Sequence, residues 1–229
     1  MANISSKLIH PEHDLKPMKP RDPFYCVACK EIGFGPGYGC PQCVVRIHKE
    51  CARPSPTMSR MIQMKHHSLK FYPDMKGENR KAGVCSACSR LVQGCGYGSS
   101  WGDDFHPACL ALPESIMVNG AEARLSYEMK SNCRWCHKIE FYVGKDKLPS
   151  WSYTGRKGRY HVGCVQDMVI ESFRNGEFAP AKEGDSAGRM QIKVDLSRGI
   201  SGFFGIGLGQ LALRGLIASI TSDPSALAG

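Results

Sequence analysis

Apolar residues recur at helical spacing in one part of the chain. Residues 162–174, VGCVQDMVIESFR, carry such a pattern, and Gly176 follows them as a stop signal. The sequence therefore predicts an amphipathic helix there, with short strands around KFYPDM (70–75) and EFYVG (140–144). The predicted buried face of the helix consists of Val165, Met168, Val169 and Phe173.

The composition changes after residue 176. GEFAPAKEGDSAGR is polar and reads as a linker, whereas residues 199–220, GISGFFGIGLGQLALRGLIASI, are nearly uncharged. Arg214 and six glycines argue against a membrane-spanning helix, because an arginine at mid-helix costs about 2.5–3.5 kcal/mol on insertion. We expect this tail to lie on an anionic membrane surface or on a partner, and a frayed or self-packed tail is the alternative.

The chain has twelve cysteines, and their chemistry depends on whether the protein lies in a reducing or an oxidising cellular compartment. The N-terminus, MANISSKLIHPEHDLK, has no apolar run after a basic start, so it does not read as a secretory signal. We expect an intracellular protein, cytoplasmic or nuclear, with peripheral membrane association as an option through the tail. Cysteine-rich spacing in a reducing compartment indicates metal binding or catalysis before disulfides.

One cysteine–histidine pattern occurs three times along the chain. A CxxC pair is followed, after 18, 17 and 24 residues, by an HxxC pair. The three sets are Cys26, Cys29, His48 and Cys51; Cys85, Cys88, His106 and Cys109; and Cys133, Cys136, His161 and Cys164.

Three thiolates and one imidazole complete a tetrahedral zinc site. Because the protein fills all four positions, no place remains for an activated water, and the zinc is expected to be structural. A thiol-disulfide oxidoreductase is the competing interpretation of the CxxC pairs, but a redox pair needs no HxxC partner and no repetition.

The first copy contains a second CxxC pair, Cys40 and Cys43. His13 is its firmest histidine partner, and His10 is the expected fourth ligand. His66 or His67 could replace His10, and the spacing does not decide between them.

His13, CVAC, CPQC and HKEC resemble the C1 zinc domain of protein kinase C, and more closely the divergent, cysteine/histidine-rich C1 domains of plants. The resemblance covers about residues 8 to 175 and implies a crossed arrangement, in which the first CxxC shares its zinc with HxxC. It predicts a small zinc-stabilised α+β fold of tandem C1-like fingers, with short antiparallel strands, one short helix per unit and little regular core. The predicted boundaries are 1–54, 55–113 and 114–175 for three units, and 176–229 for linker and tail.

The second and third copies depart from the pattern. Aligning back from His106 sets Gly98 and Trp101 against Cys40 and Cys43, so the second copy should lack a second site, with Trp101 as an apolar plug. Cys95 reads as a buried small hydrophobe. The third copy lacks both the leading histidine and the second CxxC, and His137 should be exposed. About four zinc ions are expected.

The formal charge of +9 changes once metal is counted. Eleven ligand thiolates remove eleven charges and four divalent ions add eight, which leaves about +6. One basic cluster, SWSYTGRKGRYH (150–161), interleaves aromatic and basic residues as a candidate contact for phosphates or anionic lipid heads. Its named members are Trp151, Arg156, Lys157 and Arg159, and a merely solvated loop is the alternative.

Units of about fifty residues are near the lower limit for a self-sufficient core. Structural zinc, at roughly 10–16 kcal/mol per ion, should make folding conditional on metal. A zinc-built adaptor that binds proteins in stress, defence or developmental signalling is the first functional prediction. A lipid-binding C1-like module and a chromatin or nucleic-acid reader follow, and an enzyme is disfavoured because no nucleophile–base pair or open metal position is visible.

Overall fold

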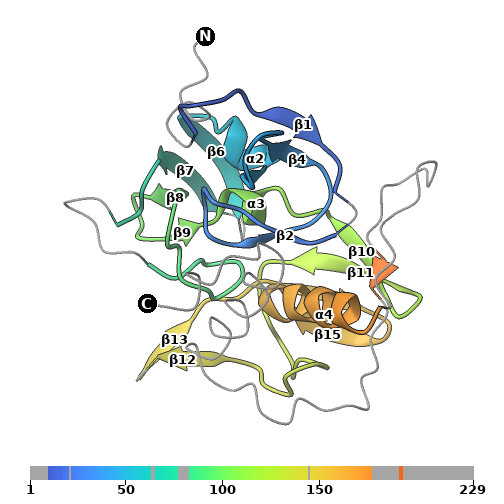
Figure 1. Ribbon diagram of the computed structural model, residues 1–229. Coiled ribbons are helices and arrows are strands. Elements are labelled where there is room, and N and C mark those ends of the chain that lie inside the picture. Colours follow the sequence, from blue (N-terminus) through green and yellow to red (C-terminus); the bar gives the residue numbers. More distant parts are fainter. Residues whose placement is uncertain are drawn as a thin grey trace.

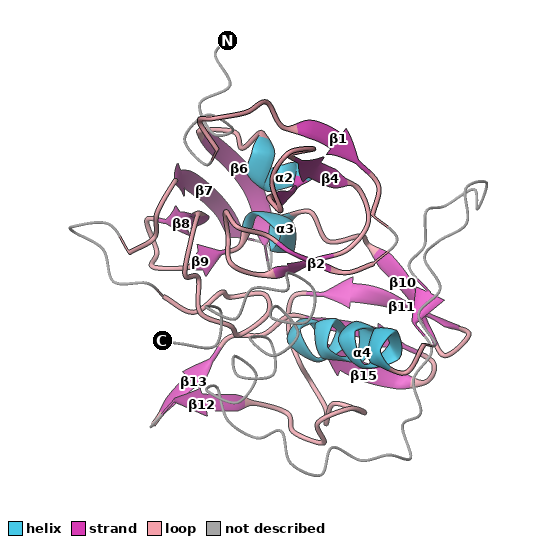
Figure 2. Ribbon diagram, in the orientation of Figure 1, coloured by secondary structure: helices cyan, strands magenta, loops and turns pink. Residues whose placement is uncertain are grey.

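The computed structural model describes residues 10–20, 22–62, 65–76, 83–143, 145–176 and 191–192. Within these ranges short strands dominate, and three helices lie among them (Figures 1 and 2). Among these described helices, none has both the length and the apolar composition needed to cross a membrane. The expectations for the tail at 199–220 fall outside the described residues.

The first part of the fold combines a small sheet with a hairpin. The sheet is antiparallel in the order β1-β4-β5, β2 pairs with β3, and a one-turn helix follows β5. Phe24 and Ile47, both fully buried, fill the space between these elements. The elements are β1 (Lys16–Met18), β2 (Phe24–Tyr25), β3 (Ile32–Gly33), β4 (Gly37–Gly39), β5 (Arg46–His48) and α2 (Lys49–Ala52).

The second part is a four-stranded antiparallel sheet in the order β6-β7-β8-β9. The strand predicted around KFYPDM is the end of its second strand. Leu69 and Tyr97 point into the core from neighbouring strands. The elements are β6 (Thr57–Ile62), β7 (Lys65–Tyr72), β8 (Gly96–Ser99), β9 (Asp104–Phe105) and α3 (Pro107–Leu110).

The third part is a five-stranded sheet in the order β15-β14-β11-β10-β16, in which only the β10–β16 pair is parallel. A separate hairpin, β12–β13, contains the strand predicted around EFYVG. The elements are β10 (Ser115–Val118), β11 (Ala121–Ser126), β12 (Phe141–Val143), β13 (Asp146–Leu148), β14 (Ser152–Gly155), β15 (Gly158–His161), α4 (Val162–Arg174) and β16 (Gln191–Ile192).

Helix α4 has the bounds that the sequence pattern predicts. Val165, Met168 and Val169 are at most 4% exposed, and Phe173 is half-buried. Gly176 takes a left-handed φ of 70° and donates its backbone N–H to the carbonyl of Phe173 over 3.0 Å, which closes the helix. In Figure 1 the helix lies alongside β15.

The core is larger than predicted. One buried cluster runs without interruption from the β6–β9 sheet into the β10–β15 sheet. Aromatic side chains join the two sheets, because the ring of Trp151 lies 5.7 Å from Phe105 and 4.8 Å from Tyr127 between centroids. The prediction of little regular core is therefore wrong for this part of the chain, since residues distant in sequence supply a shared interior.

Apart from β16, the strands of each sheet fall within residues 1–54, 55–113 or 114–175. We call these ranges the first, second and third unit. Among the described residues of each unit, one helix follows directly after the histidine of HxxC.

Candidate metal centres

The three CxxC pairs that share a cluster with an HxxC pair lie in turns with the same backbone geometry, at residues 26–32, 85–91 and 133–139; we call these turns the knuckles. In each, the residue after the second cysteine donates its N–H to the carbonyl of the first cysteine over 2.9 Å. That residue has a left-handed φ of 60–65°, uncommon outside glycine. The three residues are Lys30, Ser89 and His137. The turn brings both thiols of the pair to one side, and His137 is exposed, as predicted.

The histidine of each HxxC motif is the residue immediately before a helix. His48, His106 and His161 have extended backbone angles, with φ from −67° to −58° and ψ from 142° to 150°. The cysteine three residues later lies in the first helical turn, and residues three apart share a face of a helix. The imidazole and the thiol therefore approach the same knuckle.

Distances within these clusters agree with zinc coordination. Bonds of about 2.3 Å to sulfur and about 2.0 Å to nitrogen, at tetrahedral angles, place sulfur and nitrogen about 3.6 Å apart. From the histidine Nδ1, the Sγ of the second knuckle cysteine lies at 3.3–3.4 Å and the Sγ of the HxxC cysteine at 3.7–3.8 Å in all three units. The donor atoms of each cluster lie within 4.8 Å of one another, and all twelve residues are buried.

Each ligand imidazole also contacts the backbone of the last residue of a knuckle. The Nε2 of His106 lies 3.2 Å from the carbonyl oxygen of Leu91, and that of His161 lies 3.0 Å from the carbonyl of Ile139. His48 is hydrogen-bonded to the backbone of Ile32. All three carbonyls belong to the last residue of a knuckle. Donation from Nε2 leaves Nδ1 as the metal ligand and fixes the ring orientation.

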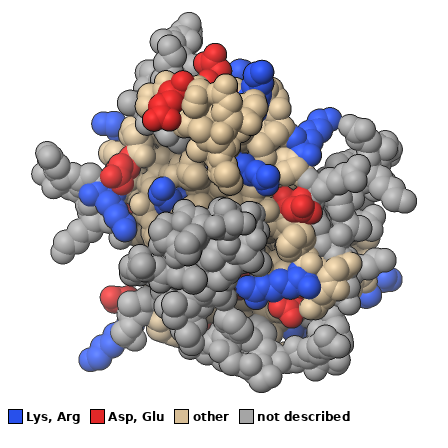
Figure 3. All heavy atoms as spheres, in the orientation of Figure 1, with Lys and Arg blue, Asp and Glu red and all other residues tan. Residues whose placement is uncertain are grey.

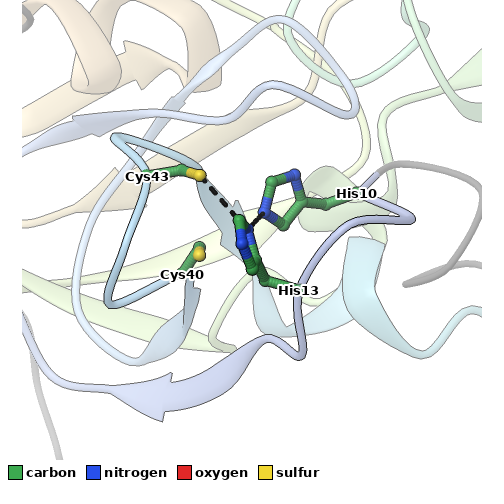
Figure 4. A group of neighbouring side chains, drawn as sticks. All are labelled: His10, His13, Cys40 and Cys43. Carbon is green, nitrogen blue, oxygen red and sulfur yellow. Dashed lines mark hydrogen bonds between the residues drawn. The ribbon is translucent and has the colours of Figure 1, made fainter.

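A fourth cluster forms in the first unit from His10, His13, Cys40 and Cys43 (Figure 4). The Nδ1 of His13 lies 3.4 Å from the Sγ of Cys43 and 3.2 Å from the Nε2 of His10. The structure thus brings His10 to this cluster. His67 instead lies 3.5 Å from Asp103, and the side chain of His66 is outside the described part of the chain.

The second unit has hydrogen bonds where the first has this extra cluster. Gly39 of β4 and Gly98 of β8 hold the same register position, so Ser99 corresponds to Cys40. Asp103 accepts a hydrogen bond from Ser86 (2.9 Å), and its backbone N–H donates to the hydroxyl of Ser99 (3.0 Å). The predicted alignment of Gly98 with Cys40 is therefore wrong by one residue, because the turn after β8 is one residue shorter than the turn after β4.

Trp101 is 78% exposed at the tip of this turn, so the predicted apolar plug is also wrong. Polar groups around Asp103 stabilise the turn without an apolar filler. Cys95 is 2% exposed in the buried cluster of the first unit, where its thiol contacts the ligand thiol of Cys51, and this confirms the predicted burial of a small side chain.

The basic cluster at residues 150–161 is a β-hairpin rather than an open loop. Trp151, the residue before β14, is 2% exposed, so its predicted contact with lipid is corrected: its ring packs on Phe105 and Tyr127 in the core. Arg156 and Lys157 are exposed at the turn and Arg159 is half-buried, and their contact with anions stays a prediction. On the face drawn in Figure 3, basic side chains are scattered among acidic ones.

The thiols of one cluster differ in pKa. Hydrogen bonds from Cys136 and Cys164 hold the pKa of Cys133 far below its ordinary range. Burial raises the pKa of Cys26, but hydrogen bonds from neighbouring cluster groups outweigh burial and lower it. The first knuckle cysteine is thus a ready thiolate, whereas the HxxC cysteine must lose a proton before it binds metal.

Sequence reasoning missed three charged residues at the meeting point of the units: Glu31, Arg90 and Asp167. Arg90 lies 3.3 Å from Glu31 and also contacts Asp167. The signal was available in part, because Glu31 and Arg90 both follow the second knuckle cysteine by two residues and have opposite charges.

Four closed Cys/His clusters in a small, strand-rich fold define a zinc-binding protein with about four structural zinc sites. Residues 9–52, which contain two of the clusters, match the family model of the C1 domain. Comparison of the chain with curated proteins and with solved structures gave no significant match.

Proposed function

We propose that the protein is a zinc-built scaffold that binds protein partners as an adaptor in intracellular signalling. The observation that carries this proposal is the closure of all four clusters: each has four protein ligands, so none leaves a position for substrate or water. A C1 domain at residues 9–52 is consistent with a binding module rather than an enzyme.

The second and third units are, in this proposal, degenerate C1 units. Their knuckles repeat the hydrogen bonds and left-handed residue of the C1 segment. The strand opposite the ligand histidine also repeats, since Tyr38, Tyr97 and Tyr153 occupy the same register position. This repetition supports three tandem copies with boundaries at about residues 54 and 113.

A thiol-disulfide oxidoreductase is less favoured because such an enzyme must expose its attacking thiolate. Cys26, Cys85 and Cys133 are all fully buried. Each is the thiol of its cluster with the lowered pKa, so the sulfur that most readily forms a thiolate is fully buried.

Lipid binding through the first unit is less favoured for a similar reason. Ile32 is 3% exposed and packs on Ile170 of α4, with Phe34 against the same pair. Apolar side chains near the loop of the C1 segment therefore contact the third unit. Arg156 and Lys157, exposed at the hairpin turn, leave an anionic surface as the second candidate.

Binding to reconstituted partners tests the proposal. Proteins enriched by proximity labelling of the full chain would be purified and titrated calorimetrically against the zinc-loaded chain and against the chain treated with chelator. We expect at least one direct partner, with affinity reduced at least about tenfold after zinc removal.

Flotation with vesicles that contain phosphatidylserine is the companion measurement, on the full chain and on a chain ending at Arg198. Flotation of both chains, without any zinc-dependent protein partner, would replace the adaptor with a lipid reader. Flotation of the full chain alone would assign the membrane contact to the tail.

A further inference from the structure

Neighbouring units contact each other at a position that recurs in the fold. Gly37 lies opposite His48 and Ser152 lies opposite His161, and the register of β8 and β9 places Gly96 in the same relation to His106. The residue just before each of these is Pro36, Cys95 or Trp151. We call this place the docking position.

In the second and third units the docking residue binds the knuckle of the preceding unit. Cys95 donates its backbone N–H to the carbonyl of Ala28, and Trp151 donates to the carbonyl of Ala87, both over 2.9 Å. Ala28 and Ala87 are equivalent, since each directly precedes the second cysteine of its knuckle. The same head-to-tail hydrogen bond therefore occurs twice.

Close backbone packing accompanies both bonds. A Cβ on Gly94 would lie 2.0 Å from the carbonyl oxygen of Ala28, and one on Gly163 would lie 2.5 Å from that of Cys88. Side chains are excluded at both places, so the second and third units each rest directly on the preceding knuckle.

Charged side chains connect all three units at this junction. Arg90 of the second knuckle contacts Glu31 of the first knuckle at 3.3 Å, and it also contacts Asp167 and, at 3.2 Å, the carbonyl of Gly163 in α4. The side chains of Arg90 and Glu31 are only 22% and 11% exposed. An arginine between two carboxylates in a partly buried place is held by planar, directional hydrogen bonds.

Glu31 also reaches the metal site of the next unit. Its Oε1 lies 3.6 Å from the Nε2 of His106, whose N–H is donated to the carbonyl of Leu91 and whose Nδ1 faces the cysteines of the second site. At this separation the carboxylate acts on the imidazole through its charge and not as a hydrogen-bond acceptor. The first knuckle thus places a negative charge beside a ligand of the second site, and the second knuckle holds the helix that contributes Cys164 to the third.

We propose that the first and second knuckles are docking platforms for the units that follow them, and that Arg90 is the positioning residue that makes zinc binding at the three CxxC/HxxC sites cooperative. This inference rests on the zinc scaffold proposed above. Zinc orders a knuckle, and an ordered knuckle favours the docked neighbour whose own ligands are then in place. By linkage, each zinc strengthens the others equally in return.

Stepwise zinc removal from the full chain tests the coupling. Native mass spectrometry during titration with EDTA would count ions per chain for the unaltered protein, for Arg90→Met and for Lys138→Met. Lys138 is the matched control, because it holds the corresponding position in the third knuckle and is exposed. Couplings between sites are commonly about 5- to 150-fold.

We expect the unaltered chain and Lys138→Met to lose the three coupled ions together, with few intermediates. Arg90→Met should populate intermediates and lose zinc about tenfold more readily. Independent release from the unaltered chain would overturn the coupling and leave a four-zinc scaffold intact. Fewer than four bound ions at the start would instead contradict the scaffold.

A second variant keeps the test decisive if Arg90→Met does not fold. Cys164→Ser removes a ligand of the third site alone, and alkylation of Cys85 and Cys88 under EDTA then reports the second site. The coupling predicts alkylation about tenfold faster than in the unaltered chain. An unchanged rate would overturn it.

Discussion

Gly94 shows at the scale of one residue how tightly the first two units pack. Replacing it with alanine places a methyl group 2.0 Å from the carbonyl oxygen of Ala28, where only backbone can yield. We expect Gly94→Ala to lower the free energy of unfolding of the zinc-loaded chain by about 1–3 kcal/mol. Urea denaturation measures this, with exposed Ser100→Ala as the control. Equal stability of the two variants would contradict the close contact.

The protonation of the ligands at the third site predicts how its affinity for zinc depends on pH. Burial lowers the pKa of His161, but hydrogen bonds to Cys133 and Cys136 outweigh burial and raise it to about 10. Hydrogen bonds to the same two cysteines raise the pKa of Cys164 well above its ordinary value. Both groups hold a proton at pH 7 without metal, and zinc must displace both.

Zinc affinity at this site should therefore rise with pH and fall on acidification, by at least about a hundredfold per pH unit, because zinc displaces at least these two protons. Competition with a chromophoric chelator at pH 6.5 and 7.5 measures the change, and release of at least about two protons into weak buffer checks the count. Affinity that does not change between these pH values would show that the ligands are already deprotonated.

Helix α4 is the element on which the third unit depends most. Within this helix the side chain of Met168 is fully buried, whereas that of Glu171 is partly exposed. We expect Met168→Ala to destabilise the zinc-loaded chain by about 2–5 kcal/mol, because it removes apolar contacts and leaves a cavity. Thermal unfolding followed by circular dichroism compares it with Glu171→Ala. A similar loss from both would show that α4 contributes little through packing.

Elements set by local spacing were predictable, and those set by distant contacts were not. The bounds of α4 and the proximity of knuckle and HxxC residues follow from short-range patterns and metal chemistry. Trp151 reads as a loop aromatic because nothing nearby in sequence reveals Phe105 and Tyr127 as its neighbours. Arg90 reads as one surface charge among many, since its partners lie 59 and 77 residues away.

The metal content of the whole molecule follows from its four clusters. The purified chain should carry about four zinc ions, and its cluster thiols should resist alkylation until a chelator is added. Cys40→Ser should lose one ion, because it breaks only the cluster with His10, His13 and Cys43. Native mass spectrometry gives the count, with exposed Ser100→Ala as the control. Four ions in Cys40→Ser would show that this cluster does not bind zinc.

Pro36 occupies the docking position of the first unit, where Cys95 and Trp151 each donate a backbone N–H in the units that follow. Proline has no such hydrogen to donate. A head-to-tail contact that does not close on itself can extend from molecule to molecule into an open filament. Because Pro36 cannot make the hydrogen bond that the contact uses, one chain cannot add to the end of another in this way. A single imino acid in the first unit thus removes the donor that an intermolecular copy of this contact would need.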